Sequence, residues 1–533
     1  MEDTSVQTSE QTAAVLMLQG TASDVGKSVI TTALCRIFKQ DGFRPAPFKS
    51  QNMALNSYVT EDGKEIGRAQ GAQAEACGIE ATTDMNPILI KPVRDMHSQI
   101  VVHGVPLAQM SAWDYRQHFL PEAKATVMDA LNRLRATYNI VLMEGAGSPA
   151  EINLKDRDIV NMNLAGWADA PVILISDIDR GGVFASIVGT MELLEPHEAQ
   201  RVKGFIINKF RGDLSLLQPG LDWLEERTGI PVLGVLPYIS DIQIEAEDSV
   251  VLDSMRHGKS GEQELDLDLD LAVIRYPRIS NFTDFDALSR EPDVNVRYVT
   301  SPDDLGQPDA ILLPGTKDTI GDLAFLRASG LEQAISSQTE REHVQLIGIC
   351  GGYQMLGQHL KDPFDVEVNQ IQEANGLGWL PLSTTFLQNK QTVRASGHVH
   401  SFHPIRLPKD SEAASSLPIN GYEIHMGVTE CLEPERVMAL FEIGHSGGQP
   451  FNEGWGTVDG KVWGTYLHGL FESDQFRRSW LNGLREGKGL APLLETYSAR
   501  ERKEMEFDRV AESLRSSLDM QRVYEIMGVQ APV

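Results

Sequence analysis

Cysteine is scarce in this sequence and forms no recognisable framework. The four cysteines, Cys35, Cys77, Cys350 and Cys431, are widely scattered, and no two lie at the spacing of a zinc site or a redox pair. A disulfide framework is therefore not expected, and a reducing, cytoplasmic location is predicted. Long apolar runs are also missing, so no membrane span is expected. The acidic, polar stretch 1–5 lacks the pattern of a signal peptide.

Positive charge is the second shortage. The chain has 47 lysines and arginines against 75 aspartates and glutamates, which gives a formal net charge of −28. A charge of this sign argues against nucleic-acid binding as a general function. It also means that an anionic substrate would need a local pocket of cations and hydrogen-bond donors. No feature of the sequence indicates an oligomeric state.

Apolar runs alternate with helical patterns over most of the length. The chain has 533 residues, more than one core normally supports, and 41% of them are hydrophobic. The alternation predicts an α/β fold with mostly parallel sheets covered by helices. The predicted strands are Val15–Leu18, Ile140–Met143, Val172–Ser176, Gly204–Asn208, Val232–Leu236, Leu271–Ile274, Ala310–Leu313 and Leu346–Ile349, with a β-rich stretch at Trp455–Leu467.

An acidic and polar break between residues 240 and 270 divides this pattern, as is typical of a connector. The helical spacing from Ser498 to Met527 predicts a helical end to the chain. We therefore predict a disordered N-terminus at 1–13, a first domain at 14–240, a linker at 241–268, a second domain at 269–485 and a helical C-terminal tail at 486–533.

The most informative stretch is Gly20 to Ser28, Gly-Thr-Ala-Ser-Asp-Val-Gly-Lys-Ser, between a predicted strand and a predicted helix. This is the arrangement of a phosphate-binding loop, in which backbone N–H groups and the positive end of the helix dipole face an anion. We expect ATP to be bound by Gly20, Thr21, Gly26, Lys27 and Ser28, with Ser28 also holding Mg²⁺. The first glycine lies one residue earlier than in the standard spacing.

Polar side chains end three other predicted strands of the same half. Glu144, Asp177 and Asn208 each lie at or just after the carboxyl end of a strand. Ligands of open α/β sheets bind at these ends. We therefore expect Glu144 and Asp177 to assist Mg²⁺ binding and Asn208 to contact the nucleotide. Each acid taken alone could instead be a helix cap or a surface residue.

A stretch rich in small residues, Glu65 to Gly78, predicts a closely packed helix. Its polar residues include Arg68, Gln70 and Gln73. The helix either faces a substrate or forms a small-residue packing interface, and the sequence favours neither.

The second half contains a candidate nucleophile, Cys350, in the stretch Gly-Ile-Cys-Gly-Gly. Glycines on both sides permit the sharp strand-to-helix turn that exposes a nucleophile, and a helix N-terminus lowers the pKa of a thiol. His468, far downstream after an apolar run, would act as its base. Gly315 and Gly351 would supply the N–H groups of an oxyanion hole. The alternative is a buried structural cysteine.

These motifs resemble two known families. The loop at Gly20–Ser28 is similar to that of dethiobiotin synthetase and its relatives, which activate a carboxylate with ATP through a phosphorylated intermediate. The surroundings of Cys350 and His468 resemble a class I, triad-type glutamine amidotransferase, which implies glutamine as the nitrogen donor and a second α/β domain. That family usually has a glutamate two residues after the histidine, where this sequence has Leu470; Glu472 lies four residues after it.

The whole chain, from Gly20 to about Leu470, resembles the cobyric acid synthase family of corrinoid biosynthesis. The stretches that support this resemblance are Lys49–Ser57, Ile66–Gln70, Met85–Pro92, Asp177–Phe184 and Tyr422–Gly427. The resemblance implies ATP- and glutamine-dependent amidation of the b, d, e and g carboxylates of adenosylcobyrinic acid a,c-diamide. The candidates for contacts with this corrinoid are Lys49, Arg68, Lys91, Arg180 and His425, the last of which could equally be structural.

Two alternatives stay open. One is the sister enzyme, cobyrinic acid a,c-diamide synthase. The other is an ATPase switch of the MinD type with an inactive glutaminase half. Ala22 argues against the switch, because it stands where ParA and MinD proteins have a signature lysine. The intact pair of Cys350 and His468 argues against it as well.

Overall fold

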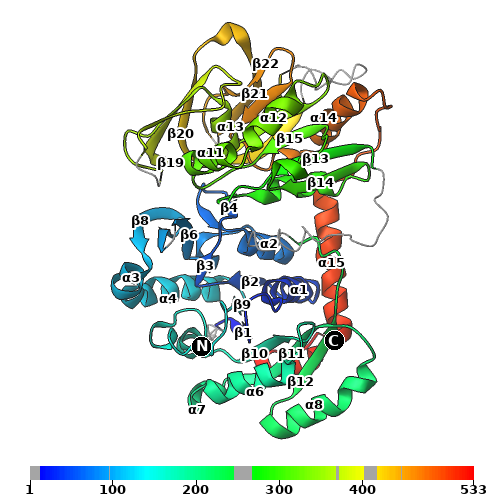
Figure 1. The fold of residues 1–533 in the computed structure, drawn as a ribbon. Helices are drawn as coiled ribbons and strands as arrows, with labels where there is room; N and C mark the ends of the chain where they lie inside the picture. Colours follow the sequence, from blue (N-terminus) through cyan, green and yellow to red (C-terminus); the bar gives the residue numbers. More distant parts are fainter. Residues whose placement is uncertain are drawn as a thin grey trace, which may run out of the picture.

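The computed structural model describes residues 12–94, 96–244, 267–367, 371–400, 417–445 and 447–532. Most of the predicted N-terminal segment, 1–13, and of the predicted linker, 241–268, lies outside these residues, so the domain limits stay predictions. Figure 1 shows two α/β bodies, one above the other, with the earlier part of the chain in the lower one. Both contain a sheet with parallel strands, so the predicted fold class is confirmed.

The first sheet has six parallel strands in the order β12-β11-β10-β1-β9-β2. Its interior strands are nearly continuous apolar runs, as expected of a sheet covered on both faces. Because the strands are parallel, all their carboxyl ends meet at one edge. The strands are β1 (Ala14–Gly20), β2 (Pro45–Phe48), β9 (Ile140–Glu144), β10 (Val172–Asp177), β11 (Val202–Phe210) and β12 (Val232–Pro237).

Helices cover both faces of this sheet (Figure 1). Two separate apolar clusters result, because alternate residues of each strand point to opposite faces. The helices are α1 (Lys27–Gln40), α2 (Arg68–Cys77), α3 (Ala112–Asp114), α4 (Leu120–Thr137), α5 (Met162–Ala168), α6 (Val183–Leu193), α7 (Pro196–Ala199) and α8 (Leu214–Thr228).

Two small sheets between β2 and α4 have no counterpart in the sequence prediction. One contains β3 (Gln51–Met53), β6 (Ile88–Arg94), β7 (His97–Val102) and β8 (Val105–Ser111). The other is a hairpin of β4 (Ser57–Val59) and β5 (Glu65–Gly67), which points toward the upper body in Figure 1. The predicted helix at Glu65–Gly78 is therefore wrong over its first three residues, because Glu65–Gly67 pairs with β4 and the helix begins at Arg68.

The second sheet has eleven strands in the order β14-β13-β15-β16-β23-β22-β21-β19-β17-β18, with β20 paired to β19. The strands from β14 to β23 are parallel, and the rest is mainly antiparallel. The strands are β13 (Leu269–Ile274), β14 (Val294–Val299), β15 (Ala310–Leu313), β16 (Gln345–Ile349), β17 (His359–Lys361), β18 (Glu373–Asn375), β19 (Leu382–Val399), β20 (Pro418–Cys431), β21 (Val437–His445), β22 (Phe451–Thr457) and β23 (Val462–Thr465).

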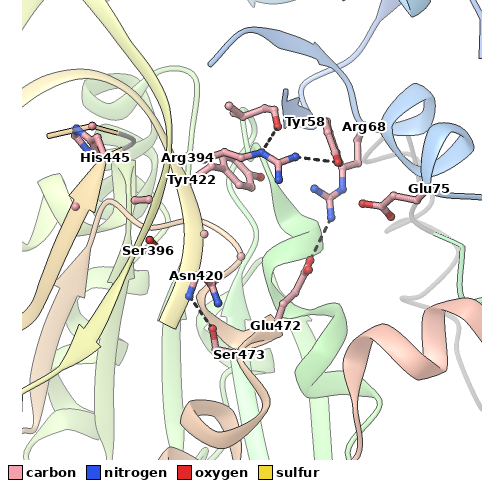
Figure 2. A pocket seen from close by; sticks show the side chains of 16 residues that line it. Tyr58, Arg68, Glu75, Arg394, Ser396, Asn420, Tyr422, His445, Glu472 and Ser473 are labelled. Carbon is pink, nitrogen blue, oxygen red and sulfur yellow. Dashed lines mark hydrogen bonds and ion pairs between the residues drawn. The ribbon is translucent and has the colours of Figure 1, made fainter. Parts of the chain in front are cut away.

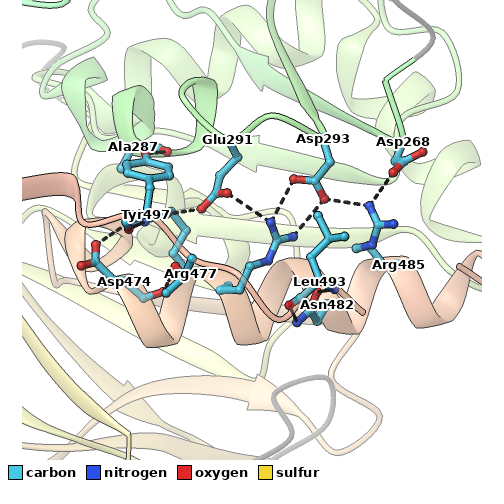
Figure 3. A network of polar contacts seen from close by, with 12 residues as sticks. Asp268, Ala287, Glu291, Asp293, Asp474, Arg477, Asn482, Arg485, Leu493 and Tyr497 are labelled. Carbon is cyan, nitrogen blue, oxygen red and sulfur yellow. Dashed lines mark hydrogen bonds and ion pairs between the residues drawn. The ribbon is translucent and has the colours of Figure 1, made fainter. Parts of the chain in front are cut away.

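A buried network of ion pairs holds the last helix of this body against the residues just before β14 (Figure 3). Arg477 Nε lies 2.7 Å from Glu291, while Arg478 and Arg485 lie 2.9 and 2.8 Å from Asp293. Removing one partner would leave an uncompensated buried charge, so the pairs fix the position of the helix. The helices of this body are α10 (Asp286–Ser289), α11 (Thr319–Ala328), α12 (Leu331–Thr339), α13 (Gly351–Leu356) and α14 (Asp474–Gly487).

The C-terminal residues return to the first body. Helices α15 (Ala499–Ser517) and α16 (Met520–Met527) contribute Phe507, Leu514 and Tyr524 to the apolar cluster that also contains residues of β1 and α1. Figure 1 shows α15 running alongside the first body toward the C-terminus. Among the helices in the described ranges, none is long and apolar enough to cross a bilayer.

Candidate active sites

The loop between β1 and α1 is shaped by two glycines. Gly26 has a φ of 98°, which favours glycine. A β-carbon on Gly20 would lie only 2.9 Å from Lys27 Nζ and 2.6 Å from the Val25 side chain. Steric contacts therefore explain why glycine stands at position 20, one residue earlier than in the standard spacing. Lys27 Nζ folds back over the loop and donates hydrogen bonds to the backbone carbonyls of residues 22 and 147, at 3.0 and 3.2 Å.

A buried carboxylate, Glu144, stands next to this loop at the end of β9. Ser28 Oγ donates to its Oε1 at 2.9 Å, Lys49 Nζ lies 3.1 Å from the same oxygen, and Gln73 Nε2 donates to Oε2 at 2.7 Å. Burial alone would raise the pKa of Glu144, but the charge of Lys49 and the three hydrogen bonds lower it below its ordinary value. Glu144 is therefore a charged group held at the loop.

The oxygen donors at this loop suit Mg²⁺ only in part. The Ser28 hydroxyl and the Glu144 carboxylate are adjacent hard ligands of the kind that Mg²⁺ prefers, together with water and phosphate oxygens. Asp177, the third predicted ligand, instead faces Lys209 Nζ at 2.8 Å. In the parts of the chain that the structure describes, no three acidic, histidine or cysteine side chains form a metal site by themselves.

Asn208 and Thr21 support the loop rather than lying apart from it. Asn208 Nδ2 donates to the carbonyl of Val25 at 2.8 Å, and a β-carbon on Gly26 would come within 2.2 Å of that nitrogen. Thr21 Oγ1 lies 2.9 Å from Ser176 Oγ on the neighbouring strand. The predicted contact of Asn208 with the nucleotide stays a prediction.

Arg68 and Arg180, two of the predicted corrinoid contacts, lie in different surroundings. Arg68 Nη2 is 3.2 Å from Glu472 of the second body, in a cavity of about 700 Å³ between the two bodies (Figure 2). Arg180 is exposed at the turn before α6. Arg68 of the first body and Glu472 of the second body therefore contact each other directly.

Lys91 belongs to a buried cluster between the two bodies. Its Nζ lies 2.5 Å from Glu65 Oε1, and Lys390 of the second body pairs with the other carboxylate oxygen. Burial raises the pKa of Glu65, but the two lysines lower it well below its ordinary value overall. Burial lowers the pKa of Lys390 to about 7, against the opposing effect of Glu65. The sequence does not mark Lys390 or Glu65 as a pair, because they are 325 residues apart.

His425 has a packing role in this structure. Its ring stacks on Tyr466 with centroids 3.8 Å apart, and its Nδ1 lies 2.7 Å from the carbonyl of Gly427. Burial lowers its pKa to about 4. A neutral, stacked ring matches the structural interpretation of this residue; its predicted contact with a corrinoid stays a prediction.

Cys350 stands on a sharp turn between β16 and α13. Its φ of 52° and ψ of −108° are strained for a residue with a side chain. A β-carbon on Gly348 would lie 2.6 Å from backbone atoms of Tyr353, and one on Gly352 would lie 2.0 Å from the carbonyl of Leu313. Only glycine fits at either position. This is the geometry of a nucleophile elbow, and it leaves Cys350 only 7% exposed.

His468 is completely buried and faces both Cys350 and a carboxylate that the sequence analysis missed. Its Nδ1 lies 2.7 Å from Asp284 Oδ2, and Asp284 Oδ1 accepts a hydrogen bond from the N–H of Gly469 at 2.9 Å. Burial lowers the pKa of His468, but the charges of Asp284 and Cys350 and hydrogen bonds to both raise it to about 10. Glu472 instead contacts Arg68.

A signal for Asp284 is present in the sequence, although it is weak. The residue follows β13 by ten positions, in the short 3-10 helix η4 (Phe282–Phe285), and β13 is a parallel strand of the sheet that also contains β16 and β23. The carboxyl ends of these strands meet at one edge, which brings Asp284, Cys350 and His468 together.

The two predicted oxyanion glycines lie close to this group. A β-carbon on Gly315 would be 3.1 Å from Cε1 of His468, and one on Gly351 would be 3.0 Å from the backbone nitrogen of Thr316. The N–H of Gly352 donates to the carbonyl of Pro314 at 3.0 Å, which fixes the loop against the helix start. The N–H of Gly351 belongs to the first turn of α13, where backbone donors have no partner within the helix.

Comparison with known families agrees with this division into two sites. Residues 16–251 match the model of a CobQ/CobB/MinD/ParA nucleotide binding domain, and residues 270–476 match that of a CobB/CobQ-like glutamine amidotransferase domain.

Similar proteins cover nearly the whole chain. One from Desulforamulus reducens, named cobyric acid synthase, is 52% identical over 97% of this chain and 98% of its own length. Proteins of the same name from Geobacillus sp. (strain WCH70) and Dehalococcoides mccartyi (strain CBDB1) are 50% and 49% identical, over 96% and 97% of this chain and 97% and 99% of their own lengths.

Proposed function

Because the chain belongs to the cobyric acid synthase family and is a glutamine-hydrolysing amidotransferase, we propose that it amidates the b, d, e and g carboxylates of adenosylcobyrinic acid a,c-diamide. ATP and glutamine would be consumed, and the product would be adenosylcobyric acid. The four cysteines are free, which supports the proposed cytoplasmic location.

The observation that supports this proposal best is the presence of two chemically different sites in one chain. Glu144, Lys27 and Ser28 lie together at the first sheet and are the proposed phosphate site, and Cys350, His468 and Asp284 lie together at the second and are the proposed thiol site. A chain with both can release ammonia at one site and use it at an activated carboxylate at the other. An ATPase switch would not need the thiol site.

The thiol site would act as follows. Cys350 attacks the side-chain amide carbon of glutamine as a thiolate, and the N–H groups of Gly315 and Gly351 stabilise the resulting oxyanion. His468, oriented by Asp284, protonates the departing nitrogen, so ammonia leaves and a thioester remains. His468 then takes a proton from water as the water attacks the thioester, and glutamate is released.

The phosphate site would activate the acceptor. The carboxylate of the corrinoid attacks the γ-phosphorus of ATP, ADP departs, and ammonia then displaces phosphate from the acyl phosphate to give the amide. Lys27 would neutralise charge on the transferred group. Ser28 and Glu144 would hold Mg²⁺, which supplies further neutralisation of phosphate charge when it is bound.

The substrate can be tested directly with purified protein. We expect the a,c-diamide to be amidated in series, so that mass spectrometry of a time course shows partly amidated intermediates before the final product. Conversion of unamidated cobyrinic acid only at its a and c positions, with the a,c-diamide left unchanged, would contradict the proposal and favour the sister enzyme.

A further inference from the structure

One short segment of the first body reaches both candidate active sites. At its start, Lys49 Nζ lies 3.1 Å from Glu144 beside the phosphate loop. At its end, the N–H of Ser57 donates to Asn281 Oδ1 at 2.9 Å, and Asn281 Nδ2 lies 3.3 Å from His468 Nε2. We call residues 49–57 the bridging segment. Part of it, β3, is held by parallel pairing to β6, so the segment is not a free loop.

The contact between the bridging segment and the thiol site is buried. Asn56, Ser57, Asn281 and His468 are each no more than 3% exposed. Asn56 Oδ1 accepts a hydrogen bond from the N–H of Phe282 at 3.2 Å, and Phe282 begins the helix η4 that contains Asp284. Buried polar groups left without partners are costly, so these contacts hold η4 and the segment in one arrangement.

Asn281 is oriented from both sides. Its φ of 50° is left-handed, a conformation that asparagine adopts more readily than most residues. Because its Oδ1 accepts from Ser57, its NH₂ group is the part that faces the imidazole, where it limits the position of the ring by contact and can donate to Nε2 only when the imidazole is neutral. The ring of Tyr422 packs on the imidazole at a centroid distance of 5.2 Å, while its hydroxyl donates to the carbonyl of Ser57 at 3.4 Å. The position of the His468 ring thus depends on the bridging segment as well as on Asp284.

We propose that Asn281 is a positioning residue for His468, and that the bridging segment transmits the state of the phosphate site to the thiol site through it. This inference rests on the proposed function. Nucleotide and metal at Ser28 would compete with Lys49 for Glu144, since Ser28 and Lys49 contact the same carboxylate oxygen. A shift of Lys49 would then move Asn56 and Ser57 against Asn281.

The same interface offers a matched control in Arg394. Its Nε donates to the carbonyl of Val59 and its Nη2 donates to the Tyr58 hydroxyl, both at 3.0 Å (Figure 2). These contacts also join the two bodies, but they involve neither η4 nor Asn281. Arg394→Gln therefore removes contacts between the bodies while leaving the hydrogen bonds of Asn281 and Asn56 in place.

The test compares glutamine hydrolysis with and without ATP, Mg²⁺ and cobyrinic acid a,c-diamide. In the unmodified protein we expect these additions to stimulate hydrolysis. Asn281→Gly retains the left-handed backbone but removes the amide, and we expect it to lower the stimulated kcat about tenfold and the basal kcat less, so that the stimulation ratio falls. The KM for glutamine should change less than twofold, and synthesis with ammonium salts should be retained. Arg394→Gln should leave the ratio unchanged.

A second variant, in the first body, keeps the test valid if the Asn281→Gly protein does not fold. Asn56→Ala should lower the ratio in the same way, and the double variant should show no further loss. An unchanged ratio in a folded Asn281→Gly or Asn56→Ala protein would overturn the proposal, as would an equal loss in Arg394→Gln. Glutamine hydrolysis without any stimulation in the unmodified protein would overturn it too. Absence of glutamine hydrolysis altogether would instead contradict the proposed function.

Discussion

The two bodies use the same local unit, a strand, a glycine turn and a helix, for opposite purposes. In the first, residues 22–24 of the loop are exposed, while Lys27, itself 8% exposed, donates hydrogen bonds to backbone carbonyls. In the second, Cys350 is 7% exposed and His468 is fully buried. An open loop can accept a large, highly charged ligand, as proposed for the first site, whereas the proposed thiolate and its base would gain from exclusion of water. The difference lies in what is packed over the turn and not in the turn itself.

The comparison extends to the carboxylate beside each turn. Glu144 is surrounded by an ammonium ion and two neutral donors, which keep its pKa below the ordinary value. Asp284 faces an imidazole and helps to raise that ring's pKa to about 10. One carboxylate is thus arranged as a fixed negative charge, and the other stabilises a positive charge on a neighbour.

Removal of the thiol should have the largest effect and should separate the two sites. Cys350→Ala eliminates the proposed nucleophile, and losses of this kind reach about 10⁴-fold or more. We expect glutamine-dependent synthesis to disappear while synthesis with ammonium salts continues. His468→Asn should behave in the same way. Normal use of glutamine by Cys350→Ala would show that another group is the nucleophile.

Removal of the Lys27 ammonium group should reduce synthesis with either nitrogen source. Lys27→Ala loses the charge proposed to stabilise the transferred phosphoryl group, and we expect a decrease of about 10³-fold in synthesis with glutamine or ammonium salts. Coupled measurement of ADP release checks this. If only the glutamine-dependent reaction fell, Lys27 would not belong to the activation step.

Neutralising the Asp284 carboxylate should reduce activity less than removing Cys350 or Lys27, and it should change the pH profile of glutamine hydrolysis. In Asp284→Asn the ring is still contacted but its positive form loses a charge partner, so its pKa falls from about 10. We expect glutaminase kcat to fall about 10²-fold and its decline with rising pH to begin at lower pH. A profile that keeps its alkaline limb would show that Asp284 does not set the pKa of His468.

The smallest effect should come from Glu472, which lies four residues after His468, near the position of the family's usual glutamate. Glu472→Gln loses a partly exposed ion pair with Arg68, and such pairs contribute about 1 kcal/mol or less. Glutaminase activity should change less than twofold, and Leu470→Glu should likewise have little effect on the orientation of His468. A loss as large as that of Asp284→Asn would place Glu472 at the imidazole instead.

Sequence reasoning located both turns because each is a local pattern with a steric cause. Gly20, Gly26 and Gly348 are required by contacts or backbone angles within a few residues of the turn, so strand and helix context identified them. Most of the parallel strands were equally accessible, since their apolar runs are continuous. The edge strands β2 and β14 were not predicted; β2 contains two prolines, and β14 is only partly buried.

Long-range pairing was not accessible in this way. Asp284 lies 184 residues from His468, on a short 3-10 helix without a recognisable motif. Glu65 was assigned to a helix, but two lysines from different parts of the chain hold it in a hairpin between the bodies. Such tertiary contacts override local helix propensity.

The return of the C-terminus to the first body has a consequence for how the protein is made. Phe507, Leu514 and Tyr524 complete an apolar cluster on one face of the first sheet, yet they are synthesised after the whole second body. Until they emerge from the ribosome, that face stays exposed to water while the second body is already complete in sequence and able to begin folding. Removal of α15 and α16 would therefore destabilise the first body, although that body is translated before the second.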